Sequence, residues 1–392
     1  MSQNDDLAYA MTIYKFLTLP LGVWPLQKYN TFSLVRSIIC GFSITVMLIT
    51  LLIEINFGSD DVYLKLDALM LIICNSLAVT KLLAFRLYAD NLTRNYSSAV
   101  NDYLTIDTKE KRTIMRRHAF LGRMICYSIL FFAYLGSITF IFTPMFAGDS
   151  ENIQVNVTAK NKISELPVPV TFLGELCLPT SVYVVISTVQ VFIMILTSTS
   201  NCGNDSLYFA ITLHVCGQIK ILKIEFLKYG MKSKNLNEDF SILVLRHRYL
   251  IKHAEYLADA ISSVLLIQLL LSCIIISLVG FQLIWALKMN DAVIIIKTTS
   301  VLSALLLQLF FYSCVGDYLK CQTEEIANSI YSCNWYNLPT KLIRNVLFVI
   351  MRSQQPVQLL AGRCFVVNIK TYMTILKSSL SYLSVLRVMM NT

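Results

Sequence analysis

Six long apolar runs alternate with polar, often basic, segments along the 392 residues of the chain. Each run approaches or exceeds the roughly 20 apolar residues that a helix needs to cross a bilayer. Because backbone groups in lipid must be hydrogen-bonded within their own segment, we expect helices in these runs. The predicted spans are residues 34–55, 66–85, 125–142, 181–202, 261–285 and 294–314.

A seventh span is predicted over residues 365–386, although polar residues interrupt its apolar pattern. A shorter apolar run, Leu342 to Ile350, lies before it and has too few residues to cross a bilayer. The N-terminal segment lacks the basic and apolar pattern of a cleaved signal peptide. The pattern therefore predicts an all-α integral membrane protein with seven transmembrane helices, the first of which serves as the targeting signal.

The composition supports a membrane protein, since 56% of the residues are hydrophobic and 15% are charged. Soluble domains carry about 25% charged residues. The net charge of +9 comes from Lys and Arg between the spans, so it indicates cytoplasmic loops and no nucleic-acid partner. The eleven cysteines show no zinc-site spacing, and we expect neither a metal nor a disulfide framework.

The distribution of Lys and Arg among the loops predicts the orientation of the chain. The loops between spans two and three and between spans four and five are rich in basic residues. The loop between spans three and four holds Lys160 and Lys162 against four carboxylates. The N-terminus is therefore predicted in the cytoplasm and the C-terminus outside, the reverse of a G-protein-coupled receptor. Asn156, in a glycosylation sequon, then lies in an outer loop.

The sequence offers no candidate for catalysis, because it lacks phosphate-loop, dinucleotide, nucleophile-elbow and zinc-protease motifs. We expect no enzyme and no cofactor. Lys81 is predicted to extend to the cytoplasmic interface, with Asp67 near the outer one. The histidines lie in predicted cytoplasmic segments and are expected to be solvated or interfacial: His118, His214, His247 and His253.

Neutral polar residues such as Tyr134 and Ser300 lie within the spans. They can hydrogen-bond neighbouring helices, or they can be the few polar groups of an apolar ligand cavity. Periodicity leaves both interpretations open.

Hydroxyl residues of the seventh span, followed by two valines, form a stripe with spacings of three and four, which places them on one helical face. Such a stripe faces either a neighbouring helix or a wetted pore that closes with an apolar ring. A pore would require further subunits. The stripe consists of Thr371, Thr374, Ser378, Ser381, Val385 and Val388.

Two segments resemble a known family. The stretch from Gly316 to Tyr336, GDYLKCQTEEIANSIYSCNWY, resembles the segment after span six of insect odorant receptors. The tail, with QLLAGR from Gln358 and TYMTILKSSLSYLSVLR from Thr371, resembles the last helix of that family, closest to the expansions of ants, bees and wasps. Thr371 and Tyr372 are not followed by the Gln-Phe ending of gustatory receptors, which favours an odorant receptor.

The resemblance implies a tuning subunit of a tetrameric, ligand-gated, non-selective cation channel. Such a subunit assembles with a shared co-receptor in the plasma membrane, binds small volatile hydrophobic odorants and depolarises olfactory neurons. The alternative is a gustatory-type channel that acts without the co-receptor. The implied regions are a cytoplasmic N-terminus (1–33), a ligand-binding bundle (34–315), a cytoplasmic anchor (316–360) and a pore helix with an extracellular tail (361–392).

The resemblance also implies roles for particular residues. The subunit anchor is expected at Trp335, Tyr336, Leu342 and Val346. The pore wall and its extracellular gate are expected at Thr374, Ser378, Ser381, Val385, Val388 and Met389. Lys377 beside this stripe would repel cations, which fits a pore supplied mostly by co-receptor subunits. Ligand-binding positions, chosen by depth and chemistry in the outer halves of the spans, are Met70, Leu71, Tyr134, Ile138, Phe142, Tyr183, Ile186, Ser300 and Ser303.

Overall fold

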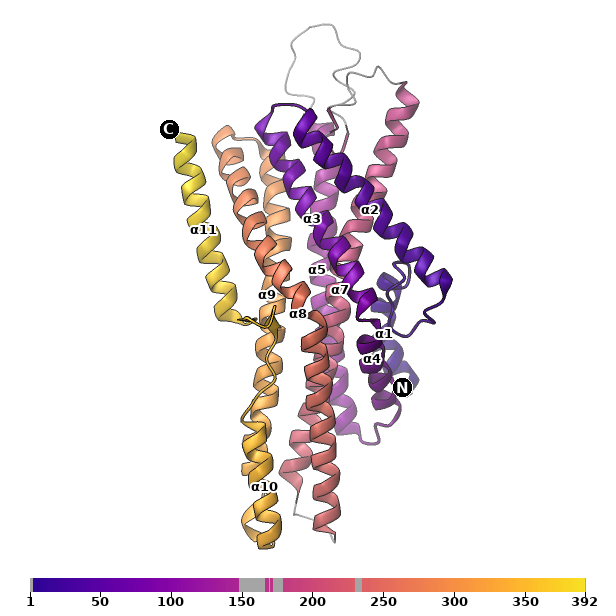
Figure 1. Cartoon of the computed structure of the whole chain (residues 1–392), viewed down its shortest axis with the longest axis vertical. Coiled ribbons are helices and arrows are strands. Elements are labelled where there is room, and N and C mark those ends of the chain that lie inside the picture. The colour runs from indigo at the N-terminus through magenta and orange to yellow at the C-terminus, as the bar shows by residue number, and fades with distance from the viewer. Residues whose placement is uncertain (1–2, 148–165, 169, 172–178, 230–234, 392) are drawn as a thin grey trace.

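The computed structural model describes residues 3–147, 166–168, 170–171, 179–229 and 235–391, so the Asn156 sequon lies outside the described residues. These residues form a helical bundle with one small hairpin (Figure 1). The elements are α1 (Gln3–Thr18), α2 (Thr31–Phe57), α3 (Val62–Leu87), α4 (Ala89–Leu104), α5 (Lys109–Ala147), α7 (Thr180–Lys228), α8 (Leu236–Met289), α9 (Ala292–Tyr331), η3 (Trp335–Asn337), α10 (Thr340–Ser353), β1 (Leu360–Ala361), β2 (Phe365–Val366) and α11 (Ile369–Asn391).

Six described helices are long and apolar enough to cross a membrane: α2, α3, α5, α7, α8 and α9. The six apolar spans predicted from the sequence are thus confirmed. Four of these helices are much longer than a span, with 39 residues in α5, 49 in α7, 54 in α8 and 40 in α9. At 1.5 Å per residue, α8 is roughly 80 Å long, whereas a bilayer core is roughly 30 Å thick. The bundle therefore extends past the bilayer towards α10, and we call this the α10 end (lower in Figure 1).

Helix α11 has 23 residues, so it is also long enough to cross. It begins at Ile369 and not at residue 365, where the sequence predicts the seventh span to start. The reason is that Phe365 and Val366 form strand β2, which pairs antiparallel with Leu360 and Ala361. The predicted start of the span is therefore wrong by four residues.

The β1–β2 hairpin turns the chain from α10 into α11. Gly362 and Arg363 at its tip have positive φ angles of 59° and 60°, a conformation that favours glycine. The Gly362 N–H donates to the Ser262 carbonyl of α8 at 2.9 Å. On the other side, a Cβ on Gly316 of α9 would lie 2.4 Å from the Val367 carbonyl oxygen. Gly316 and Gly362, one in each of the two family-like segments, thus permit close packing of the hairpin on α8 and α9.

Helix α11 lies at the edge of the bundle, beside α8 and α9 (Figure 1). It contacts them through one face: the Tyr372 ring packs on Phe310 at 5.8 Å, and the Ser379 hydroxyl donates to the Cys273 carbonyl at 3.3 Å. A Cβ on Gly280 of α8 would lie 3.3 Å from the Leu383 side chain. The small residues of α8 therefore let α11 approach closely.

Candidate ligand-binding site

A cavity of about 130 Å³ lies between helices α2, α3, α5, α7 and α9. Its wall is mostly apolar, as in sites for small hydrophobic ligands. The lining residues are Met47, Met70, Leu71, Cys74, Asn75, Leu77, Ile129, Ala133, Gly136, Ser137, Phe140, Ile193, Met194, Thr197, Ser198, Asn201, Cys202, Val301, Ala304, Leu305 and Gln308.

Small side chains on facing helices leave this space open. On α5, Ile129, Ala133, Gly136 and Phe140 line the cavity at spacings of three and four, so they share one helical face. A Cβ on Gly136 would already be in van der Waals contact with Val301 on α9, at 3.5 Å, so a larger side chain there would have to extend into the cavity or push α9 away. The cavity thus exists because alanine and glycine stand where larger residues would fill it.

The polar groups in the wall bond mainly to one another. The Thr197 hydroxyl donates to Asn75 Oδ1 at 2.8 Å, and the Ser137 and Ser198 hydroxyls lie 2.7 Å apart. Asn201 Nδ2 donates to the Cys74 carbonyl at 3.1 Å, which leaves the buried Asn201 Oδ1 without a partner in the described part of the chain. A ligand with a hydroxyl group could donate a hydrogen bond to this oxygen.

One buried ion pair lies beside the cavity near the ends of α3 and α9 that are remote from α10. Lys297 Nζ is 2.6 Å from an Asp67 carboxylate oxygen, and Gln282 Nε2 donates to the other oxygen at 2.8 Å. The Lys297 ammonium also lies 4.5 Å from the ring centroids of Tyr63 and Phe140. Because Phe140 lines the cavity, this ion pair contacts its wall.

A second buried ion pair lies on the opposite side of the cavity. Lys81 Nζ is 2.8 Å from Asp205, and both side chains are completely buried. Tyr312 donates to Asp205 at 2.5 Å, as does Gln308, which also lines the cavity. The prediction that Lys81 extends to the interface is therefore wrong, because Asp205 on α7 supplies a partner inside the bundle. Asp67 likewise lies inside the bundle.

The two ion pairs bracket the cavity along α3. Asp67 and Lys81 are 14 residues apart, or roughly 21 Å along a helix. The cavity residues Met70 to Leu77 lie between them. Charged groups inside a membrane are expensive unless paired, so both pairs hold α3 to α7 and α9 in one arrangement around the cavity.

Of the predicted ligand-binding residues, Met70 and Leu71 line the cavity. Ile138 and Phe142 instead point outward, with 49% and 46% of their side-chain surface exposed. The Tyr134 hydroxyl bonds to Thr199 at 2.8 Å, outside the cavity lining. These three residues lie at the depth of the cavity along α5, but on a face of the helix next to the one that lines it.

The other predicted ligand-binding residues also lie away from this cavity. Tyr183 and Ile186 pack with Leu166 and Val170 in a separate small cluster. The hydroxyls of Ser300 and Ser303 donate within their own helix α9, to Ile296 and Thr299. A stripe of small and polar residues at helical spacing, Ala133 and Ser137 on α5 with Thr197 and Asn201 on α7, is the sequence signal that marks the cavity faces.

The predicted pore stripe lies on the side of α11 that does not face the bundle. Thr374, Ser381 and Val385 are exposed, Ser378 is half-buried, and Lys377 is exposed beside them. Val388 and Met389 belong to α11, but their side chains lie outside the described residues.

The predicted anchor residues divide into two groups. Trp335 and Tyr336 form the short helix η3, and the Tyr336 side chain is 65% exposed. Leu342 and Val346 are buried within their own chain. The apolar side chains that remain exposed on α10 are Leu347, Phe348 and Met351.

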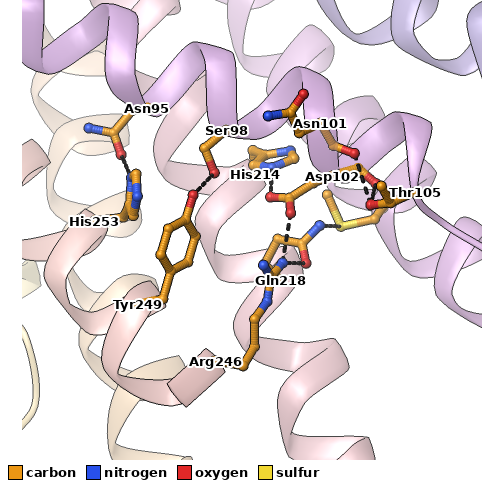
Figure 2. A network of polar contacts seen from close by, with 11 residues as sticks. Asn95, Ser98, Asn101, Asp102, Thr105, His214, Gln218, Arg246, Tyr249 and His253 are labelled. Carbon is orange, nitrogen blue, oxygen red and sulfur yellow. Dashed lines mark hydrogen bonds and ion pairs between the residues drawn. The ribbon is translucent and has the colours of Figure 1, made fainter. Parts of the chain in front are cut away.

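All four histidines are buried, so the expectation of solvated or interfacial histidines is wrong. Figure 2 shows the reason for two of them, which is that α4 supplies polar partners to α7 and α8. His214 contacts the Asp102 carboxylate at 3.1 Å, and His253 contacts Asn95 at 2.7 Å. No group of three or more metal-ligating side chains converges in the described ranges.

Asp102 is the charged centre of this network (Figure 2). Arg246 of α8 donates to it at 2.7 Å and also to Gln218 of α7. Burial alone would raise the pKa of Asp102, but the hydrogen bond and charge of His214, together with those of Arg246, outweigh burial and lower it. Since the folded pKa lies below the unfolded value of about 3.9, Asp102 stabilises the fold above that pH, and this contribution disappears as the pH falls through the folded pKa.

We therefore expect Asp102→Asn to lower the stability of the solubilised protein at pH 7 by about 2 kcal/mol, because charge-assisted hydrogen bonds are lost. The difference from the unmodified protein should shrink below about pH 4 as Asp102 itself is protonated. Melting temperatures between pH 7 and pH 3 measure this. Asp107→Asn, at an exposed position, is the control. Equal losses in both variants, or a pH-independent difference, would contradict the assignment.

Comparison with known proteins identifies the family. The profile of the family described as 7tm Odorant receptor matches residues 62–380, which is most of the chain. The chain belongs to the insect odorant receptor family. It is therefore a multi-pass membrane protein of a non-enzymatic family of olfactory channels, as the resemblance implies.

The odorant receptor has relatives among flies and mosquitoes. Odorant receptor 9a of Drosophila melanogaster is 31% identical over 186 residues, which are 47% of this chain and 46% of that protein. Odorant receptor 10 of Aedes albopictus is 22% identical over 303 residues, 76% of each chain. The matched segment thus covers about half of the first of these relatives.

A solved structure has the same fold as this odorant receptor. It is the insect olfactory receptor OR5 from Machilis hrabei in complex with eugenol, with a TM-score of 0.77 and 14% identity over 97% of this chain and 100% of that one. The odorant receptor fold of this chain is thereby shown, and the all-helical prediction is confirmed.

Proposed function

We propose that this chain is the odorant-binding subunit of a ligand-gated, non-selective cation channel in the plasma membrane of olfactory neuron dendrites. The observation that carries the proposal is the apolar cavity between five helices. An apolar cavity of about 150 Å³ admits benzene, so the cavity of about 130 Å³ here suits a small volatile molecule. The unpartnered Asn201 Oδ1 favours odorants that carry a hydroxyl group.

The proposed topology has seven spans with the N-terminus and the α10 end in the cytoplasm. Basic loops between spans two and three and between spans four and five support it. Helix α11 would then be the seventh span, running from the cytoplasm to the outside. Residues 1–33 and 316–360 would be cytoplasmic, and residues 361–392 would form the pore helix and tail.

Gating requires that the odorant bind the open state better than the closed state. Helix α9 offers a route, since Val301 to Gln308 line the cavity and the next turn contacts α11 through Phe310 and Tyr372. A shift of α9 on ligand binding would displace α11. The exposed stripe of Thr374, Ser381 and Val385 would then change its contacts with neighbouring subunits in the pore.

Assembly with the shared co-receptor as a tetramer would use the exposed apolar side chains of α10 and Tyr336. Leu342 and Val346 would support this contact from inside their own chain. The positive charge of Lys377 would repel permeating cations, and this repulsion matters less if co-receptor subunits supply most of the pore. The motifs in residues 310–392 support a relationship with the odorant receptors of ants, bees and wasps.

The experiment that tests the proposal is current recording from cells that express the chain with its co-receptor. The volatile panel should contain alcohols and hydrocarbons of matched size. We expect odorant-evoked cation currents, larger for alcohols, that vanish without the co-receptor. Currents without the co-receptor would identify a gustatory-type channel, and no current across a broad panel would contradict the proposal.

Filling the cavity should weaken the odorant response. Ala133→Phe adds a ring to the cavity wall on α5, so we expect the apparent affinity for an activating odorant to fall by tenfold or more, which is about 1.4 kcal/mol. The control is Ile138→Phe on the same helix, where the side chain is 49% exposed outside the cavity. Dose–response curves measure both variants. An unchanged response in Ala133→Phe, or an equal loss in the control, would place the odorant elsewhere.

A further inference from the structure

A second cavity, of about 610 Å³, lies between α5, α7 and α9 closer to the α10 end. We propose that it binds the phosphate-bearing headgroup of an anionic glycerophospholipid, with an acyl chain on its apolar wall. The cytoplasmic position of the cavity rests on the proposed orientation. The proposal otherwise goes beyond odorant gating, because lipid binding needs neither an odorant nor a current.

The wall of this cavity changes from apolar to charged in the same direction on facing helices. On α5, Ile125 and Leu121 are followed towards the α10 end by Arg117. On α7, Leu213 is followed in the same direction by Lys220. Ile125 is the first residue of the predicted third span, so on α5 the apolar part of the wall starts at the membrane boundary and Arg117 lies about 12 Å beyond it. A phospholipid has this same succession of acyl chain and charged headgroup.

Two cationic side chains that line the cavity are available to bind a ligand. Neither Arg117 nor Lys220 forms an ion pair among the described residues, and Arg117 is exposed while Lys220 is half-buried. A third cation, Lys223, is already occupied by Glu325 and Gln322. Basic pockets between membrane helices on the cytoplasmic side bind anionic lipid headgroups. The two unpaired cations therefore mark where a phosphate would bind.

The apolar wall distinguishes a lipid from a soluble anion. Leu121 lines the cavity four residues before the predicted third span, and it is 41% exposed. Arg117 and Ile125 are eight residues apart, roughly 12 Å along α5, which is enough to pass from a headgroup to the start of its acyl chains. A soluble phosphate would use only the charged end of this cavity.

The test is lipid binding to the purified full-length chain in a neutral detergent, measured by native mass spectrometry. We expect phosphatidylserine to bind and phosphatidylcholine to bind much more weakly. Arg117→Ala combined with Lys220→Ala should reduce phosphatidylserine affinity by tenfold or more. The matched control is Lys341→Ala with Arg344→Ala, which removes two exposed cations from α10 and should leave the affinity unchanged.

Two further comparisons distinguish a bound lipid from a soluble phosphate and control for misfolded variants. Glycerophosphoserine, which lacks acyl chains, should bind far more weakly than phosphatidylserine, and Leu121→Gln should weaken only the lipid. Arg117→Lys with Lys220→Arg keeps both charges and should retain binding. Equal affinity for the soluble headgroup, or equal losses in the cavity and control variants, would overturn the proposal. None of these experiments measures a channel current, so the lipid-binding proposal can fail independently of the proposed function.

Discussion

Replacing Lys81 with methionine is expected to leave little stable receptor. The Asp205 carboxylate would keep its hydrogen bonds from Gln308 and Tyr312 but lose its counter-ion in a site with no solvent exposure. Breaking a buried ion pair on one side costs about 3–5 kcal/mol, a large part of the 5–15 kcal/mol that stabilises a typical fold. The melting temperature and the yield of monodisperse protein after solubilisation measure the effect.

Two control variants test whether the loss of stability comes from breaking the buried ion pair. Lys65→Met removes one partner of an exposed ion pair with Asp60 and should change stability little, because surface pairs contribute about 0–1 kcal/mol. The double variant Lys81→Met with Asp205→Leu removes both buried charges and should recover much of the loss. If Lys81→Met alone melts like the unmodified receptor, the pair does not hold α3 to α7.

Replacing Val385 with serine is expected to raise the current in the absence of odorant. In the proposed pore, Val385 belongs to an apolar ring whose closure excludes water. A serine there removes roughly 1–2 kcal/mol of apolar contact from the closed state, which corresponds to about a tenfold rise in the open fraction for each 1.4 kcal/mol. Patch-clamp recording of cells with the co-receptor, before odorant is applied, measures this leak.

The control for the gate is a serine on a different face of the same helix. Leu380 is 64% exposed and lies five residues before Val385, or about 140° around the helix. Leu380→Ser should therefore leave the basal current unchanged. An unchanged basal current and odorant sensitivity in Val385→Ser would remove this residue from the gate.

The helical architecture was predictable because apolar length is a property of each segment alone. The six apolar runs became six helices, and the short run from Leu342 to Ile350 became α10. The sequence predicts the start of α11 too early, because hydrophobicity does not distinguish strand β2 at Phe365 and Val366 from the first turn of a helix.

The cavity was only partly predictable. Met70 and Leu71, which are predicted from their depth, line the cavity, whereas Ile138 and Phe142, predicted on the same ground, face outward. Depth follows from counting residues along a span, but the face that meets a ligand depends on how the neighbouring helices are rotated. The role of Gly136 depends on the approach of Val301 from α9, which the sequence does not show.

The sequence by itself determined that this protein is an α-helical membrane protein of the odorant receptor family, because burial of apolar segments in lipid and family motifs are both local features. Only the tertiary structure decided which charges meet. Lys81 pairs with Asp205 across 124 positions and Asp67 with Lys297 across 230. From the sequence Lys81 is expected at the membrane surface, and the fold buries it, since an opposite charge on another helix makes the interior tolerable.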